Sequence, residues 1–127
     1  MFYKDPLTRL TYTPGIHDIA ETKNAYWLLN AIGSHVMANP DFKKACQNSE
    51  RFHDMQIWIL EKREDHAVRL IAVEDTEKVY LENPVVEQEI EYSDFDFEDQ
   101  DNVKLYCAAN YDADGNKFYT LMKPSEY

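Results

Sequence analysis

The apolar positions between residues 24 and 38 repeat with the period of an α-helix and predict the main helix of the chain. Their i, i+3, i+4, i+7, i+11 spacing places the side chains on one face: Ala25, Leu28, Leu29, Ile32 and Val36. Pro40 ends this helix, because the residue before a proline is kept out of the helical conformation. The helix indicates a fold and carries no evident chemistry.

Short helices are predicted on both sides of the main helix. Thr13 has the residue type of an N-cap, and Pro14 suits the first helical position, where its missing N–H costs nothing. Thr22 is predicted to cap the main helix, and Asn39 to cap a third, short helix that follows it. Residues 1–13 are predicted to form an irregular arm.

After residue 54 the apolar pattern changes to the alternation of β-strands. An Asp-Gly pair at 114–115 predicts a tight hairpin between the last two strands. The strand segments are 55–61, 67–73, 78–82, 85–92, 103–109 and 117–122. The sequence therefore predicts one α+β domain over residues 1–127, with N-terminal helices packed on one face of an antiparallel β-meander of four to six strands.

Composition is that of a folded soluble protein. Of the 127 residues, 44% are hydrophobic and 13% aromatic, and no apolar run approaches the ~18 residues that a membrane span needs. The first residues lack the basic and apolar regions of a secretory signal, so a cytoplasmic location is expected. In that compartment Cys46 and Cys107 are expected to be free thiols.

The net charge of −11 lies entirely within residues 74–101, which contain twelve acidic residues and a single basic one, Lys78. The rest of the chain is balanced. The sequence is thus that of a neutral domain with one acidic segment.

Within the acidic segment, carboxylates alternate with apolar side chains. Glu87, Glu89 and Glu91 are predicted to share the solvent face of a strand, about 6.6 Å apart. Tyr92, Phe95 and Phe97 are expected to turn inward while the row continues. The predicted partner-binding residues are Glu87, Glu89, Glu91, Asp94, Asp96, Glu98, Asp99 and Asp101. They would present an acidic surface to a protein with a basic, nucleic-acid-binding surface; the alternative is a solvated edge strand that resists aggregation.

Metal, cofactor and nucleic-acid sites find little support. The four histidines lack zinc-ligand spacing, and the Asp-rich turn at 112–116 has Lys123 where a calcium loop needs Glu. Three dispersed glycines exclude a phosphate-binding loop, and no basic patch predicts direct nucleic-acid binding. No metal, cofactor or catalytic residue is therefore assigned. A loose divalent-cation site among the carboxylates of residues 94–101 stays an alternative.

Two further functions stay open. Nine tyrosines and two tryptophans could hold a nucleotide or cyclic oligonucleotide between the main helix and the sheet. A hydrolase is the other possibility, with His35 near the helix end approached by Cys46 or Cys107. An unpaired sheet edge leaves a homodimer possible.

Several blocks of the sequence resemble a known family. They are a Tyr-Thr turn at 12–13, AYWLLNAIGSH at 25–35, VKLY at 103–106 and PSEY at 124–127. Together they are similar to an uncharacterised family of small bacterial and mobile-element proteins, a domain of unknown function. The resemblance implies a prokaryotic or phage setting and no activity. The expected function is that of an acidic, non-enzymatic inhibitor of a host nucleic-acid-handling or defence system.

Overall fold

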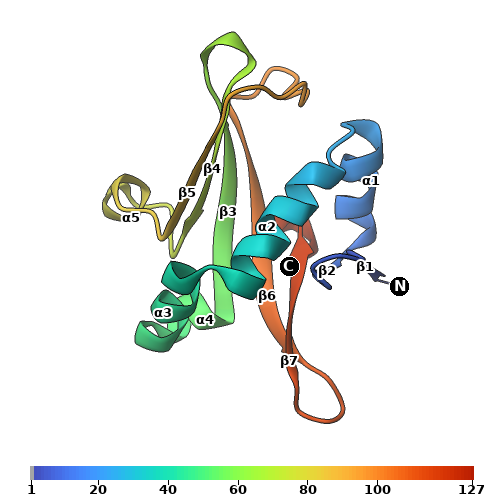
Figure 1. The fold of residues 1–127 in the computed structure, drawn as a ribbon, viewed down its shortest axis with the longest axis vertical. Helices are drawn as coiled ribbons and strands as arrows, with labels where there is room; N and C mark the ends of the chain where they lie inside the picture. Colours follow the sequence, from blue (N-terminus) through green and yellow to red (C-terminus); the bar gives the residue numbers. More distant parts are fainter. Residues whose placement is uncertain (1) are drawn as a thin grey trace.

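A seven-stranded sheet with most of its helices on one face forms the centre of the computed structural model, which describes residues 2–127. The strand order is β1-β2-β7-β6-β3-β4-β5, and α2 crosses the sheet (Figure 1). The strands are β1 (Tyr3–Lys4), β2 (Thr11–Tyr12), β3 (Met55–Lys62), β4 (Val68–Val73), β5 (Val86–Ile90), β6 (Asn102–Tyr111) and β7 (Lys117–Met122). The helices are α1 (Pro14–Thr22), α2 (Tyr26–Ala38), α3 (Pro40–Asn48), α4 (Glu50–Asp54) and α5 (Lys78–Glu82), with 3₁₀ turns η1 (Glu64–His66) and η2 (Pro124–Glu126).

The predicted α+β class is confirmed, but the sheet is larger and less regular than predicted. Within residues 1–13, predicted to be irregular, β1 and β2 form a short antiparallel pair. β2 then joins β7 in parallel, with Thr11 beside Thr120, so the sheet is mixed and is not a simple meander. The sequence carried no sign of this pairing, because two-residue strands show no period and the partner strand is distant in the chain.

The segment Lys78–Glu82, predicted to be a strand, is the short helix α5. Five residues are too few for periodicity to distinguish the two states. Tyr80 and Leu81 pack on a small apolar cluster on the far face of the sheet, formed by Ile57, Ile59, Ile71 and Val73. A single helical turn reaches that cluster while leaving Val79 exposed.

Helix caps follow the sequence in two of three cases. The Thr13 hydroxyl accepts a hydrogen bond from the Ile16 amide, and the Asn39 side chain accepts one from the Asp41 amide at 2.9 Å. The predicted cap at Thr22 is wrong. Thr22 belongs to the last turn of α1 and donates to the carbonyl of Asp18. α2 starts at Tyr26, and its N-cap residue Ala25 offers no side-chain hydrogen bond.

The main core lies between α2 and the sheet. Leu28, Leu29 and Ile32 from α2 and Trp58 and Leu60 from β3 are all at most 2% exposed. The helical stripe predicted from the sequence is therefore the face that covers β3. None of the helices in residues 2–127 is sufficiently long and apolar to span a membrane.

The C-terminus is tied to the start of α1 by Glu126. Its carboxylate accepts hydrogen bonds from the Thr13 hydroxyl (2.8 Å), the Lys123 amide (2.9 Å) and the Gly15 amide (3.2 Å). Partial burial raises the pKa of Glu126. The three hydrogen bonds together outweigh that effect, so the pKa lies below its ordinary value. This contact explains why the C-terminal PSEY block belongs to the fold.

Replacing Glu126 with Gln is expected to lower the free energy of unfolding by about 1 kcal/mol at neutral pH, through weaker hydrogen bonds. Because the folded-state pKa is lowered, the stabilisation is complete above the ordinary glutamate pKa of about 4.3 and is lost as pH falls through the folded-state value. Urea unfolding of both proteins between neutral pH and pH 3 measures this difference. Glu64→Gln is the control. An equal loss there, or a difference that does not shrink as the pH falls, would contradict the role of the Glu126 hydrogen bonds.

Candidate ligand-binding site

The predicted row of glutamates lies on the edge strand β5. Glu87 and Glu89 are exposed, whereas Val86 on the other face is buried. Glu91 is exposed just beyond the end of the strand. The alternation read from the sequence is thus present in the structure.

Neighbouring cations compensate part of this row. The Arg69 guanidinium contacts Glu87 at 2.5 Å and Glu61 at 2.8 Å, and lies 3.8 Å from Glu89. Arg63 also lies 3.8 Å from Glu89. In the loop that follows, Lys23 contacts Glu98 at 2.8 Å. Three of the eight predicted partner-binding carboxylates are therefore paired within the molecule.

The other five carboxylates are exposed and, among residues 2–127, have no ion pair: Glu91, Asp94, Asp96, Asp99 and Asp101. Phe95 and Phe97 turn inward as predicted. Tyr92, also predicted to turn inward, is 68% exposed, because β5 ends at Ile90 and the tyrosine ring instead lies 5.4 Å from His66. No group of three or more potential metal ligands occurs among the described residues.

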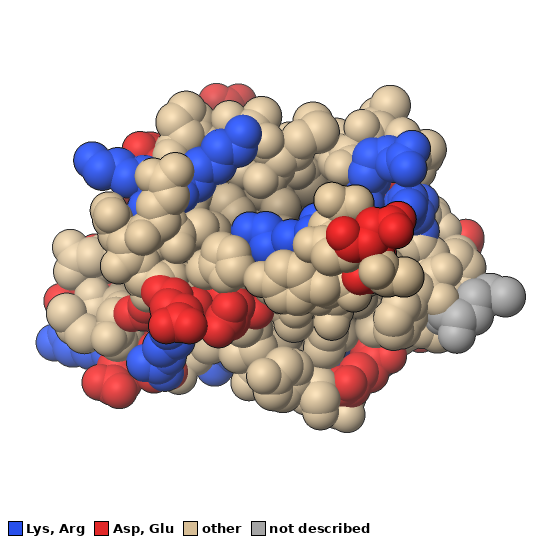
Figure 2. Space-filling view, turned by 90° about the horizontal axis from the view of Figure 1, so that it is seen from below, with Lys and Arg blue, Asp and Glu red and all other residues tan. Residues whose placement is uncertain are grey.

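A pocket of about 540 Å³ lies on the helical side of the sheet, within the ~300–1,000 Å³ typical of small-molecule sites. Its walls come from the β1–β2 loop, the second half of α2, α3, α4 and the start of β7. Arg9, Lys43, Lys117 and His53 line it, and none of the described lining residues is Asp or Glu. Figure 2 shows the hollow with Lys and Arg atoms around it.

Arg9 is held at the pocket by a tight turn. Its backbone has a φ of 68°, its amide donates to the Asp5 carbonyl at 2.8 Å, and the Asp5 amide donates to the carbonyl of Leu10 at 2.8 Å. The buried Asp5 carboxylate accepts the Thr8 hydroxyl at 2.6 Å. A left-handed conformation at a non-glycine residue costs free energy and persists only where its surroundings enforce it. The turn therefore fixes the position of Arg9.

The turn rests on α2 at Gly33. A Cβ atom on Gly33 would lie 2.0 Å from the Thr8 hydroxyl oxygen, closer than any real contact. Only glycine lets the β1–β2 loop approach the helix this closely.

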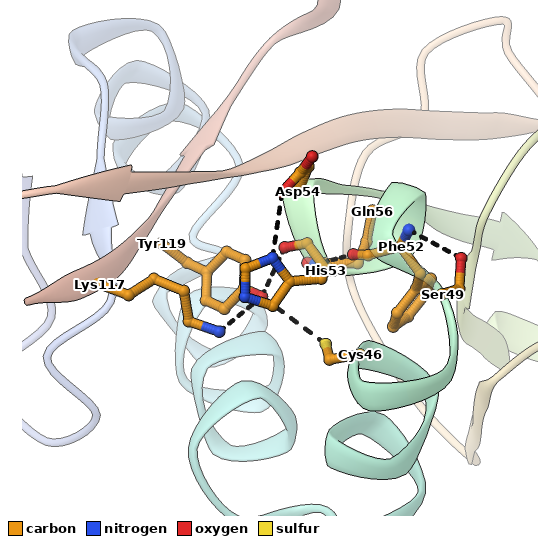
Figure 3. A network of polar contacts seen from close by, with 8 residues as sticks. All are labelled: Cys46, Ser49, Phe52, His53, Asp54, Gln56, Lys117 and Tyr119. Atoms are coloured by element: carbon orange, nitrogen blue, oxygen red, sulfur yellow. Dashed lines mark hydrogen bonds and ion pairs between the residues drawn. The ribbon is translucent and has the colours of Figure 1, made fainter.

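A polar network surrounds Tyr119 at the other end of the pocket (Figure 3). The Tyr119 hydroxyl donates to the His53 carbonyl at 2.7 Å and accepts from the Lys117 ammonium at 3.3 Å. The ammonium also lies 4.8 Å from the centre of the tyrosine ring, a cation–π distance. Burial, followed by the contact with Cys46, raises the pKa of Tyr119. The phenol is therefore neutral at physiological pH.

Among the described residues, neither cysteine is hydrogen-bonded to His35. Both cysteines are free, and Cys46 contacts the Tyr119 hydroxyl at 3.6 Å. Burial raises the pKa of the Cys46 thiol, although Tyr119 and Lys117 oppose that shift, whereas a nucleophilic cysteine needs a lowered pKa. His35 instead bonds Gln88 at 2.8 Å and Asn39 at 2.9 Å, joining α2 to β5.

A family model matches the whole chain. Residues 1–127 match the model of DUF6876, a family of unknown function. The chain belongs to this family. The resemblance found in the sequence blocks is thereby confirmed, and membership of DUF6876 brings no activity with it. No curated protein and no solved structure matched the chain.

The cations of the pocket were missed in the sequence. Arg9, Lys43 and Lys117 stand far apart in the chain, in segments where acidic and basic residues balance. Charge patterning detects runs, and here only the fold brings the three residues together.

Gly33→Ala tests the close contact between the β1–β2 loop, which carries Arg9, and α2. An exposed helical glycine replaced by alanine normally gains about 1 kcal/mol of stability. Here the added methyl group meets Thr8, so the expected result is a loss of about 1–3 kcal/mol, measured by urea unfolding. The double variant Gly33→Ala with Thr8→Gly is expected to recover part of that loss. A single variant more stable than the wild type would show that the loop does not rest on α2.

Proposed function

We propose that this DUF6876 chain binds a small anionic ligand of the nucleotide class in the pocket between α2, α3 and β7. The observation that carries the proposal is the lining of that pocket, with Arg9, Lys43 and Lys117 and no carboxylate, in a chain of net charge −11. The sequence offers a nucleotide site between the main helix and the sheet as an alternative, and this pocket is lined by residues of both.

The three cations have no ion pair among residues 2–127. The chain has 24 acidic side chains for 13 Lys and Arg, so carboxylates are abundant elsewhere. Like charges around one hollow repel each other, and an anion between them removes that repulsion. Arginine and lysine are also the side chains that bind phosphate most strongly.

Apolar side chains complete the lining and suit a nucleobase. Tyr119 from β7 lines the pocket together with Val36 and Met37 from α2. Sites for small molecules generally combine such apolar walls with a few charged groups that fix orientation. A nucleobase would pack on the walls while the phosphate meets the cations.

Nucleotides are expected to stabilise the protein, whereas the corresponding nucleosides are not, because only the nucleotides carry phosphate. At a hundred times the dissociation constant a ligand adds about 2.7 kcal/mol of stability, a shift that a thermal melt detects. Lys43→Gln should reduce the shift. Lys44→Gln, its exposed neighbour outside the pocket, is the matched control. Equal shifts with nucleoside and nucleotide, or none with either, would refute the proposal.

We propose as a second candidate the acidic protein–protein surface, now restricted to the five unpaired carboxylates. Glu91, Asp94, Asp96, Asp99 and Asp101 lie in the loop between β5 and β6 and form no ion pair among the described residues. In a phage or other mobile-element setting such a surface would inhibit a basic host protein that handles nucleic acid or acts in defence. The steering of a basic partner would depend steeply on salt.

Neutralisation of paired and unpaired carboxylates separates this candidate from a merely solubilising surface. Binding of a basic host partner at low salt is expected to fall with Glu91→Gln, Asp94→Asn and Asp96→Asn together. The matched control is Glu87→Gln with Glu89→Gln, whose carboxylates already contact Arg69. Co-purification at low salt and at about 0.5 M salt gives the readout. Equal effects of the two variants would remove the assigned surface.

A further inference from the structure

The positive charge of the pocket is distributed around it. Arg9 lies on the loop between β1 and β2, whereas Lys43 lies on α3; these elements stand to the right and left of the lower end of α2 in Figure 1. Figure 2 shows Lys and Arg atoms on opposite sides of the hollow. Lys117 approaches from a third element, β7. A ligand that used all three cations would have to present negative charge in more than one place.

The backbone that carries each outer cation is held in place. Arg9 is fixed by its left-handed turn and by the contact between Thr8 and Gly33. Lys43 lies in the first turns of α3, where its amide donates to the Asn39 carbonyl at 3.1 Å, and Asn39 caps that helix. The two side chains therefore start from fixed backbone positions on separate elements. Preorganised groups favour the ligand whose charges already match them.

We propose, building on the nucleotide-binding function above, that the ligand is a molecule with nucleobases and two separated phosphates, as in a cyclic dinucleotide. One phosphate meets Arg9 and the other meets Lys43. In nucleoside triphosphates the phosphates are contiguous, and in mononucleotides only one is present, so neither presents negative charge in two separate places. The ligand class therefore follows from the spread of the cations.

The rest of the lining fits the two bases. Tyr119 offers aromatic surface, and base–aromatic stacking stabilises nucleotide binding without selecting one base. Met37, 52% exposed at the pocket, is an unbranched side chain that adapts to bound rings. Lys117 sits over the Tyr119 ring, so its charge lies beside the stacking surface.

Calorimetric titration compares cyclic di-AMP and cyclic di-GMP with AMP, GMP and ATP at one ionic strength. At least one cyclic dinucleotide is expected to bind about tenfold or more tightly than every other ligand. Arg9→Gln and Lys43→Gln are each expected to weaken its binding by about tenfold, because each removes a charge-assisted contact. Arg9→Lys, which keeps the charge, is expected to retain most of the affinity.

The controls distinguish this inference from the function on which it rests. Lys44→Gln is expected to bind like the wild type, and melting curves establish that each variant is folded. If ATP or a mononucleotide binds as tightly as the cyclic dinucleotides, the inference fails and nucleotide binding stands. If no nucleotide binds, both fail. An equal effect of Lys43→Gln and Lys44→Gln also overturns the assignment of Lys43.

Discussion

The burial of Trp58 in the middle of the sheet is the constraint on which the arrangement depends. Its side chain is fully buried on β3, which is paired on both sides, so cover comes from the helical layer. The ring centre lies 6.0 Å from His35 of α2 and 6.2 Å from Phe42 of α3. Covering one tryptophan thus fixes two helices at once. The pocket is the space that these helices leave beside β7.

The same arrangement separates the charges. Side chains on the solvent face of β5 and β4 meet their partners there, as Arg69 and Glu87 do. Cations that project from the helical layer and the β1–β2 loop find no carboxylate among the pocket's lining residues. An acidic protein can hold a cationic pocket because alternate residues of a strand, and opposite faces of a sheet, are independent surfaces.

Local patterns predicted the elements, and long-range pairings decided the site. The apolar stripe of α2, the cap at Thr13 and the turn at Gly115, with its φ of 80°, follow from neighbouring residues. Two features depend on contacts between distant segments. They are the addition of β2 to β7 and the presence of Arg9 and Lys43 in the lining of one pocket. No period or spacing encodes them. Glu87 and Glu89 were identified correctly as surface carboxylates, and the cations that compensate them come from other strands.

Distance makes the two charged surfaces compatible. In the strand order, β6, β3 and β4 separate β7 from β5, which at about 4.8 Å per strand places them roughly 19 Å apart. The Debye length is about 8 Å at physiological ionic strength, so Glu87 and Glu89 on β5 are largely screened from the pocket. The nearby cations then set the potential that an anion meets inside. At about 0.01 M salt, where the Debye length is about 30 Å, the whole chain opposes the approach of that anion. The net charge of the chain therefore governs how fast an anionic ligand associates, and the three pocket cations govern how tightly it is bound.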